Sequence, residues 1–349
     1  MRLPGAGCGS ALLVAAVLAG CNASDPTPTS TPTTLPTASE VATADPALTP
    51  SPSRSREASP ELTAGDLRDE VQVGDIRAHL DEFQRIADEN GGNRATGTPG
   101  FDASVEYVAG RLAAAGYEVT RQAFTVGDQS SVNLIVERPG TGTEVIMLGA
   151  HLDSVEAGPG INDNGTGVGT LLVIAERLAE LPSPARTVRI AFWGAEEGGP
   201  HGSPAYVAAL PASELGRISS YLNLDMLGSP NPIRFVYAEA GAVEGSEAIT
   251  ALFSAHFDGE GLPWAPIDLT GHSDHGAFTD AGIPTGGLFS GGREPMTAEQ
   301  AAAFDGRFGD PADPCSDQAC DTIENVNQAS LGEMADAVAH AVATLAAHD

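Results

Sequence analysis

Residues 144–153 read Glu-Val-Ile-Met-Leu-Gly-Ala-His-Leu-Asp, and this stretch decides the fold class. Its first half is a short apolar run typical of a buried strand, and the run ends just before His151 and Asp153. A helical pattern follows over 165–181, and a second apolar run follows over 187–193. Strand, helix and strand in this order predict a largely parallel sheet.

The rest of the folded part repeats these two patterns. Apolar residues at helical spacing predict helices over 75–88, 102–115 and about 330–346, and short apolar runs predict strands over 132–136 and 221–224. No period of twenty to fifty residues repeats, which argues against a solenoid or a propeller. We therefore expect one α/β domain, residues 67–349, with a mostly parallel, twisted central sheet flanked by helices.

The first residues of the chain are typical of export. Residues 1–20 contain a short apolar segment of the length of a signal peptide and end in Leu18-Ala19-Gly20 before Cys21. These four residues resemble the bacterial lipobox, which implies a lipid anchor at Cys21 in the cell membrane of a bacterium. An ordinary cleaved signal is the alternative, and both place the mature chain outside the cytoplasm. Residues 21–66 are rich in Thr, Pro and Ser, which predicts a disordered tether.

The charge of the chain excludes some classes of partner, and its cysteines predict a disulfide. The chain carries 17 Lys and Arg against 47 Asp and Glu, a formal net charge of −30. Such a chain is repelled by nucleic acid and by anionic lipid surfaces. Of its four cysteines, Cys8 lies in the signal peptide and Cys21 is the predicted anchor, so Cys315 and Cys320 are expected to form a disulfide. Nothing in the sequence indicates an oligomeric state.

Potential metal ligands follow each predicted strand of the parallel sheet. His151 and Asp153 follow the first strand, Glu196 and Glu197 follow the strand at 187–193, and Asp225 follows the strand at 221–224. Ligands in open α/β sheets bind at these carboxyl ends. A glycine-rich turn over 160–167 adds Asp163. Imidazole and carboxylates together suit Zn²⁺, and an Asp between two sites can bridge two ions, so the sequence predicts two metals.

Each of these residues also has a plainer interpretation. His151 could be a half-buried structural histidine, Asp225 a helix cap, and the Glu196-Glu197 pair a solvated surface pair, while Asn-Asp-Asn-Gly around Asp163 is a turn signal. Their joint placement after consecutive strands favours the metal site over these separate explanations.

Five ordered segments resemble the secreted bacterial leucyl aminopeptidases of metallopeptidase family 28. They are residues 151–154, 160–165, 193–197, 221–226 and 273–275. The resemblance implies a zinc exopeptidase-like fold and removal of one N-terminal residue at a time from peptides, often a large apolar one. It also implies a dizinc site in which Glu196 assists the attack of a water held by the two ions.

Carried over residue by residue, the resemblance assigns roles. His151 and Asp225 would serve different zinc ions, Asp163 would bridge them, and Glu197 would be a further ligand. Glu196 would be the general base, and Asp153 would orient the imidazole of His151. Leu288 and Phe289 are candidates for the wall of the substrate pocket, although a place in a core strand is equally consistent with their apolar character.

The sequence departs from the family at two places. Family members usually have Cys-Tyr-His before a second cysteine, whereas residues 315–320 read Cys-Ser-Asp-Gln-Ala-Cys. Asp317 would replace the last zinc ligand, directly or through a water, and an all-oxygen sub-site favours Mn²⁺ or another harder ion. We expect an active but slowed enzyme. His272 stands where relatives often have Arg before Ser-Asp-His, so substrate contacts there would differ.

Two other functions remain open on the same fold. One is a single-zinc enzyme like the glutaminyl cyclases, and the other is a lipid-anchored binding protein that has lost its catalysis through Ser316 and Asp317. The bridging position of Asp163 and the Glu196-Glu197 pair favour two-metal hydrolysis of peptides over both.

Overall fold

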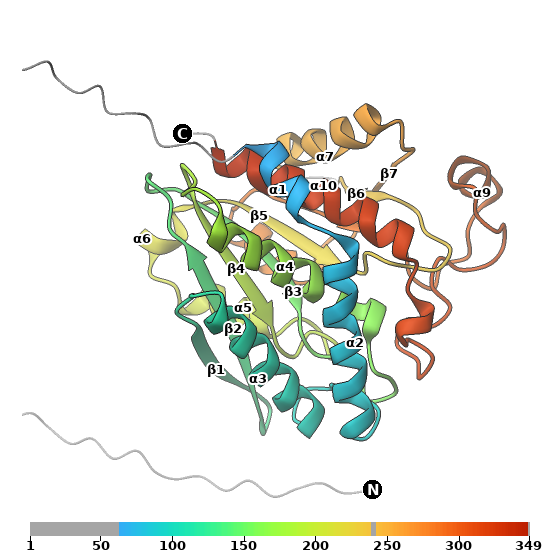
Figure 1. Cartoon of the computed structure of the whole chain (residues 1–349), viewed down its shortest axis with the longest axis horizontal. Coiled ribbons are helices and arrows are strands. Elements are labelled where there is room, and N and C mark those ends of the chain that lie inside the picture. Colours follow the sequence, from blue (N-terminus) through green and yellow to red (C-terminus); the bar gives the residue numbers. More distant parts are fainter. Residues whose placement is uncertain (1–62, 239–241, 348–349) are drawn as a thin grey trace, which may run out of the picture. The chain divides into compact units, whose positions relative to one another are not determined.

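A computed structural model of the chain describes residues 63–238 and 242–347. The predicted signal peptide, Cys21 and most of the predicted tether lie outside these residues. Within them, an eight-stranded sheet runs through the molecule with helices on both faces (Figure 1). No helix among the described residues is long and apolar enough to cross a membrane.

The sheet has a parallel centre and antiparallel flanks. Its strand order is β1-β2-β4-β3-β5-β8-β6-β7. The pairs β4/β3, β3/β5 and β5/β8 are parallel, as is β6/β7, while β1/β2, β2/β4 and β8/β6 are antiparallel. The strands are β1 Thr120–Val126, β2 Gln129–Arg138, β3 Val145–His151, β4 Thr187–Trp193, β5 Ile218–Asp225, β6 Phe235–Tyr237, β7 Ala265–Ile267 and β8 Thr285–Phe289. The prediction of a largely parallel sheet is confirmed.

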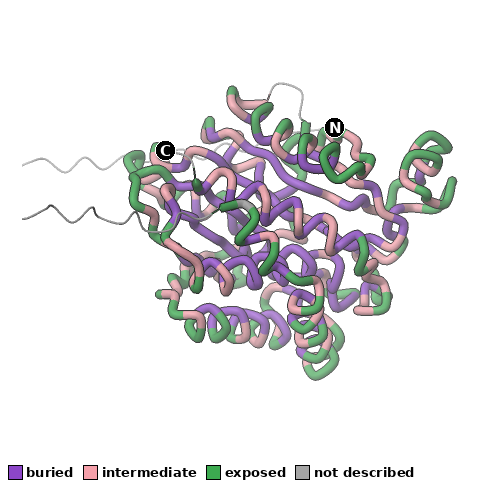
Figure 2. The backbone as a smooth tube through the Cα atoms, turned by 45° about the horizontal axis from the view of Figure 1, so that its top comes forward, coloured by how far each residue is buried: buried purple, intermediate pink, exposed green. Residues whose placement is uncertain are grey.

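Helices cover the two faces unequally. The helices are α1 Ala64–Glu70, α2 Val73–Glu89, α3 Pro99–Ala114, α4 Thr166–Glu180, α5 Gly202–Ala209, α6 Ala212–Leu215, α7 Ser246–Glu260, α8 His275–Asp280, α9 Ala298–Phe304 and α10 Gln328–Ala347. Side chains of α1, α2, α3, α4, α7 and α10 form the large core on one face, and side chains of α5 and α8 form a smaller cluster on the other. Figure 2 shows the buried strands between helices whose outer sides are exposed.

Residues 145–153, which include β3, are buried, and β3 packs on both of its faces. Ile146 and Leu148 of β3 point into the large core, while Val145 and Met147 join the smaller cluster. Gly149 lies under the Trp193–Tyr221 pair, where a Cβ atom would come within 2.2 Å of the Tyr221 hydroxyl. A continuous apolar run on a central parallel strand is explained by this two-sided burial.

The predicted helices at 75–88, 102–115 and 165–181 correspond to α2, α3 and α4, and the last predicted helix corresponds to α10. The predicted boundary between tether and domain, at residues 66 and 67, falls inside α1. Thr63 caps this helix, because its hydroxyl accepts the Asp66 amide and the Asp66 carboxylate accepts the Thr63 amide. The Thr-x-x-Asp pattern is a capping box and could have been found in the sequence.

Candidate metal centre

Three neighbouring strands bring the predicted ligands to one edge of the sheet. His151 is the last residue of β3, Asp225 is the last residue of β5, and Glu196 and Glu197 follow β4. Because β3 lies between β4 and β5 in a parallel arrangement, all these side chains leave the sheet at the same end. Asp163 comes from the tight turn at 161–165, which leads into α4 and contains a cis Asp163–Asn164 peptide bond.

His151 directs one ring nitrogen at two carboxylates. Its Nε2 atom lies 3.2 Å from Asp163 Oδ1 and 3.5 Å from Asp225 Oδ1. Its Nδ1 atom lies 3.1 Å from the backbone carbonyl of Asp153, to which it can donate a proton. That bond favours the tautomer in which Nε2 has a free lone pair. The Ser273 hydroxyl donates to the other oxygen of Asp225 over 2.8 Å.

Asp163 belongs to two groups of potential ligands. His151, Asp163 and Asp225 offer ligand atoms within 4.8 Å of one another, and so do Asp163, Glu197 and Asp317. Two such groups with one shared carboxylate have the arrangement of a two-metal site. We expected His151 and Asp225 to serve different ions, whereas their ligand atoms lie in the same group, which favours one shared ion.

The backbone after β4 is held by Asp153. Both carboxylate oxygens of Asp153 accept the Glu196 amide, each at 3.1 Å, and one also accepts the Thr96 hydroxyl at 3.3 Å. The contact of Asp153 with the His151 ring is through its backbone carbonyl, since its carboxylate lies 3.9 Å from Nδ1. Asp153 therefore positions both the imidazole and the Glu196-Glu197 segment. Ala195, just before this pair, has φ of 57°, a strained value of the kind that gathers at functional sites.

Crowding of carboxylates in a buried site shifts their pKa values. Burial raises the pKa of Glu196 to about 9 and that of Glu197 to about 10. Burial also raises the pKa of Asp163, opposed by the hydrogen bond and charge of His151 and assisted by the charges of Asp225 and Asp317. Burial acts to raise the pKa of Asp225, but its interactions with His151, Ser273 and His275 together outweigh burial and lower this pKa. A cation among these groups would relieve the repulsion that disfavours their charged forms.

The donor set fits divalent metal ions. The two groups offer one imidazole nitrogen and carboxylate oxygens, which suit Zn²⁺. Glu197 Oε1 is buried and accepts no hydrogen bond within the described part of the chain. A buried acceptor without a donor is costly unless a cation or another donor reaches it. The residues present therefore match a metal site in their chemistry and in their geometry.

Residues 133–342 match the model of peptidase family M28. The chain belongs to this family. A leupeptin-inactivating enzyme of Streptomyces exfoliatus is 42% identical over 289 residues, which are 82% of this chain and 65% of the relative. A probable lipoprotein aminopeptidase, LpqL, of Mycobacterium tuberculosis is 42% identical over 222 residues, covering 60% of this chain and 44% of LpqL. The chain thus spans less than two thirds of the length of either relative.

A solved structure agrees with this membership. BSAP, a zinc aminopeptidase of Bacillus subtilis, aligns with a TM-score of 0.54 and 27% identity, covering 64% of this chain and 52% of BSAP. The resemblance inferred from the five sequence segments is confirmed at the level of the family.

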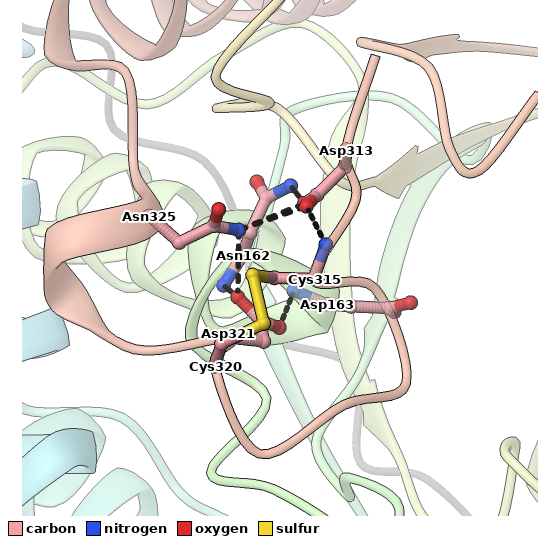
Figure 3. The surroundings of a disulfide bond; sticks show 7 residues. All are labelled: Asn162, Asp163, Asp313, Cys315, Cys320, Asp321 and Asn325. Carbon is pink, nitrogen blue, oxygen red and sulfur yellow. Dashed lines mark hydrogen bonds between the residues drawn. A yellow bond between two sulfur atoms is a disulfide. The ribbon is translucent and has the colours of Figure 1, made fainter. Parts of the chain in front are cut away.

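The disulfide loop of this M28 chain is fastened to the turn that carries Asp163. Cys315 and Cys320 form the predicted disulfide. Asp321 follows the loop, and its carboxylate accepts the amides of Asn162 and Asp163 at 2.9 Å each (Figure 3). Asp321 is 1% exposed, and burial raises its pKa to about 7. Asp321 was not predicted as a site residue, because no local sequence pattern links it to a turn 158 residues earlier.

Asp313 makes a second connection between the same two segments. Its Oδ2 atom accepts the side-chain amide of Asn162 at 2.6 Å, and its Oδ1 atom accepts the Cys315 amide at 2.8 Å (Figure 3). Asn325 donates to both oxygens of Asp313. Asp313 before the disulfide loop and Asp321 after it therefore both hydrogen-bond to the turn at 161–165.

The changed residues Ser316 and Asp317 both lie close to predicted metal ligands. The Ser316 hydroxyl donates to Asp163 Oδ2 over 3.2 Å. Asp317 lies in the group with Asp163 and Glu197, and its Oδ2 atom accepts a hydrogen bond of 2.7 Å from Arg293 Nη2.

The predicted substrate residues have different surroundings. His272 is exposed. Leu288 is 0% exposed and packs in the large core, so its position does not support a place in the pocket wall. Phe289 is half-buried and pairs in register with Asp225 across β5 and β8, which puts it beside a predicted ligand.

Arg94 is a second residue that the sequence did not reveal. It is 0% exposed, and its guanidinium donates to the carbonyls of Leu152, Pro159 and Gly160. It thereby joins the segment after His151 to the segment before Asp163. The pKa of Arg94 is lowered to about 10 by burial, which leaves the side chain charged at neutral pH.

Proposed function

We propose that this chain is an exported, lipid-anchored, two-zinc aminopeptidase that hydrolyses the N-terminal peptide bond of peptides. The observation that carries the proposal is the shared position of Asp163 in both ligand groups. A single-metal enzyme needs only one such group. Membership of the M28 family and the names of two relatives, an aminopeptidase and a leupeptin-inactivating enzyme, support the same reaction class.

The two groups divide the metal ligands. His151, Asp163 and Asp225 would hold one ion, and Asp163, Glu197 and Asp317 would hold the other. The first group contains an imidazole and suits Zn²⁺, whereas the second offers oxygen only and also suits Mn²⁺. When bound, such a pair of ions polarises a scissile carbonyl and makes a water molecule more acidic.

Glu196 is the general base in this proposal. Its amide is fixed by the Asp153 carboxylate, so the side chain starts from a held backbone. The charges that act on Glu196 are chiefly those of His151, Asp274 and Asp225, whereas Glu197 interacts chiefly with Asp163. The two adjacent glutamates therefore face different parts of the site. Glu196 would take a proton from the attacking water and return it to the leaving amine.

A preference for large apolar N-terminal residues is part of the proposal. Phe289 is half-buried beside Asp225, and its ring stacks with that of Phe235 at a centroid distance of 6.1 Å. Two aromatic rings next to a metal ligand offer an apolar wall for such a side chain. His272 is proposed to contact the substrate from the exposed rim of the site.

The cellular location rests on the sequence and on one relative. Cys21 is proposed to carry the lipid anchor, and LpqL is a probable lipoprotein. The formal net charge of −30 argues against a nucleic-acid partner.

The test compares free and blocked amino termini. The purified full-length chain is stripped of metal, restored with Zn²⁺ or Mn²⁺, and assayed on leucine para-nitroanilide and its N-acetyl derivative. We expect metal-dependent release of nitroaniline from the free substrate alone. Equal cleavage of both substrates would exclude an aminopeptidase. If the chain cleaves neither para-nitroanilide but cyclises an N-terminal glutaminyl peptide, the cyclase alternative is favoured. If it acts on none of the three substrates, a binding protein is favoured.

A further inference from the structure

Asp317 has a cationic neighbour as well as carboxylate neighbours. Arg293 Nη2 donates to Asp317 Oδ2 over 2.7 Å, and a ligand atom of Asp317 lies within 4.8 Å of those of Asp163 and Glu197. A carboxylate has two oxygens, so one can accept the arginine while the other binds a metal ion. Ligating carboxylates in proteins are commonly hydrogen-bonded in this way.

We propose that Arg293 is a positioning residue that holds Asp317 as a ligand of the second metal ion and balances its charge. The inference rests on the two-metal function proposed above. It extends that function by naming the residue that sets the affinity of the weaker metal position.

Charge balance is the first argument. Four carboxylates, those of Asp163, Glu197, Asp225 and Asp317, face the two proposed positions. Four negative charges cancel two divalent ions and leave no net positive charge to draw electrons from a carbonyl. The guanidinium of Arg293 restores one positive charge, and it does so at the outermost of the four carboxylates.

Geometry is the second argument. Asp317 lies in the disulfide loop between Cys315 and Cys320 and has φ of 56°, so its backbone is held in an uncommon conformation. Its side chain is 32% exposed and would rotate in water without a partner. The bond to Arg293 restricts that rotation and keeps the carboxylate near Asp163 and Glu197, with Oδ1 left available to an ion. A preorganised ligand binds its ion more tightly than a free one.

Repulsion between the guanidinium and a metal ion acts in the opposite direction. The Arg293 side chain is 53% exposed, so water screens this repulsion. The guanidinium contacts the Asp317 carboxylate directly at 2.7 Å, so we expect its attraction to this carboxylate to outweigh its repulsion of an ion held by that carboxylate. If Arg293 supports Asp317 as a ligand, removing its side chain should weaken zinc binding. If Arg293 mainly repels the ion, removing it should strengthen zinc binding.

The experiment is a zinc titration of the metal-stripped full-length chain by competition with a chromogenic chelator. For Arg293→Ala we expect the weaker of two sites to lose roughly tenfold in affinity, at the low end of the 10–100-fold range for partners of metal ligands, with the tighter site unchanged. Arg293→Lys keeps the charge but not the planar guanidinium, so the zinc affinity of its weaker site should lie between those of the native chain and of Arg293→Ala. Arg307→Ala is the matched control, because Arg307 lies 60% exposed in the same region and pairs with Asp310.

A double variant tests whether Arg293 acts through Asp317. In an Asp317→His background the ligand is neutral and needs no cation, so Arg293→Ala should change zinc affinity by less than about twofold. Tighter or unchanged binding in Arg293→Ala alone, or an equal loss in both backgrounds, would overturn the inference. Binding of only one ion by the unaltered chain would refute the two-metal function itself, while two ions with no effect of Arg293 would refute the inference alone.

Discussion

Removal of the Arg94 guanidinium should loosen the connection between two ligand-bearing segments. The change Arg94→Met keeps most of the side-chain volume and removes the charge and all side-chain donors. In the native chain these donors bond the carbonyls of Leu152, Pro159 and Gly160, with Nε–O and Nη2–O distances of 2.8 and 2.6 Å for the last two. The side chain is 0% exposed, so no water can replace the donors without local opening.

The expected cost follows from these three bonds. The Gly160 carbonyl also accepts the Gly165 amide at 3.0 Å, so the change leaves two carbonyls, those of Leu152 and Pro159, without their donor. A buried acceptor left unsatisfied costs about 1–3 kcal/mol, so two cost roughly 2–6 kcal/mol before relaxation. Removing a buried cation also removes its desolvation penalty of several kcal/mol, which offsets part of the loss. We expect Arg94→Met to lower the free energy of unfolding by about 2–4 kcal/mol, a large share of the stability of a typical domain.

Urea unfolding followed by circular dichroism, in chelator at pH 7.5, measures the cost. Arg85→Met is the matched control, because the Arg85 side chain is 51% exposed and bonds only to Glu82 and Glu89 on the same helix. The control should lose less than about 1 kcal/mol. Zinc affinity of Arg94→Met should also fall, since Leu152 and Gly160 are adjacent to the ligand segments. If Arg94→Met unfolds at the same urea concentration as Arg85→Met, the reasoning about buried carbonyls is refuted.

Three further results are expected. Burial lowers the pKa of His79 from 6.5 to about 4, so the unfolded chain binds the proton more readily and stability is lost as pH falls from 6.5 toward 4. When the pH is lowered from 7.5 to 5, the free energy of unfolding, measured with urea in chelator, should fall by about 2 kcal/mol more for the native chain than for His79→Gln. Equal falls in the two proteins would contradict this. Asp321→Ala removes the acceptor of the Asp163 amide, and calorimetric zinc titration should show at least about tenfold weaker binding, whereas native affinity would show that the turn is held without it. Ser316→Tyr with Asp317→His should raise turnover of leucine para-nitroanilide up to about a hundredfold, and a double variant no faster than the native chain would count against the slowed-enzyme hypothesis.

The sequence predicted the parts of the fold and site that have strong local patterns. The apolar runs of β3, β4 and β5 identified the central strands, and the ligands could be placed because parallel strands end at one edge. The five segments then identified the family. The residues that the structure brings together around Asp163 could therefore be named from the sequence as candidate ligands, including Asp317 at its changed position.

The rest depends on contacts between distant segments. Arg94 follows α2 in a turn and carries no pattern that predicts burial, and Asp321 reaches Asp163 only because the disulfide loop folds back on the turn. The pairing of Arg293 with Asp317 spans 24 residues and has no periodic signal. The grouping of His151 with Asp225 differs from the predicted division, because it depends on loop paths and not on the order of these residues in the chain.

The short strands β6 and β7 were also not predicted. Each has three residues, which is too short for alternation or an apolar run to stand out. They extend the sheet beyond β8, where Phe235 of β6 stacks on Phe289. One side of the proposed substrate pocket is thus built from an element that only the structure reveals.

The central claim is that the cluster around Asp163 holds two metal ions and that Glu196 moves the proton. Metal content and turnover of leucine para-nitroanilide, measured on the same zinc-restored samples of the native chain and of Glu196→Gln, test it most directly. The account predicts two zinc ions per chain in both proteins and a loss of turnover of about 10²–10⁴-fold in the variant alone. One ion per native chain, or a Glu196→Gln variant that keeps its turnover, would contradict it.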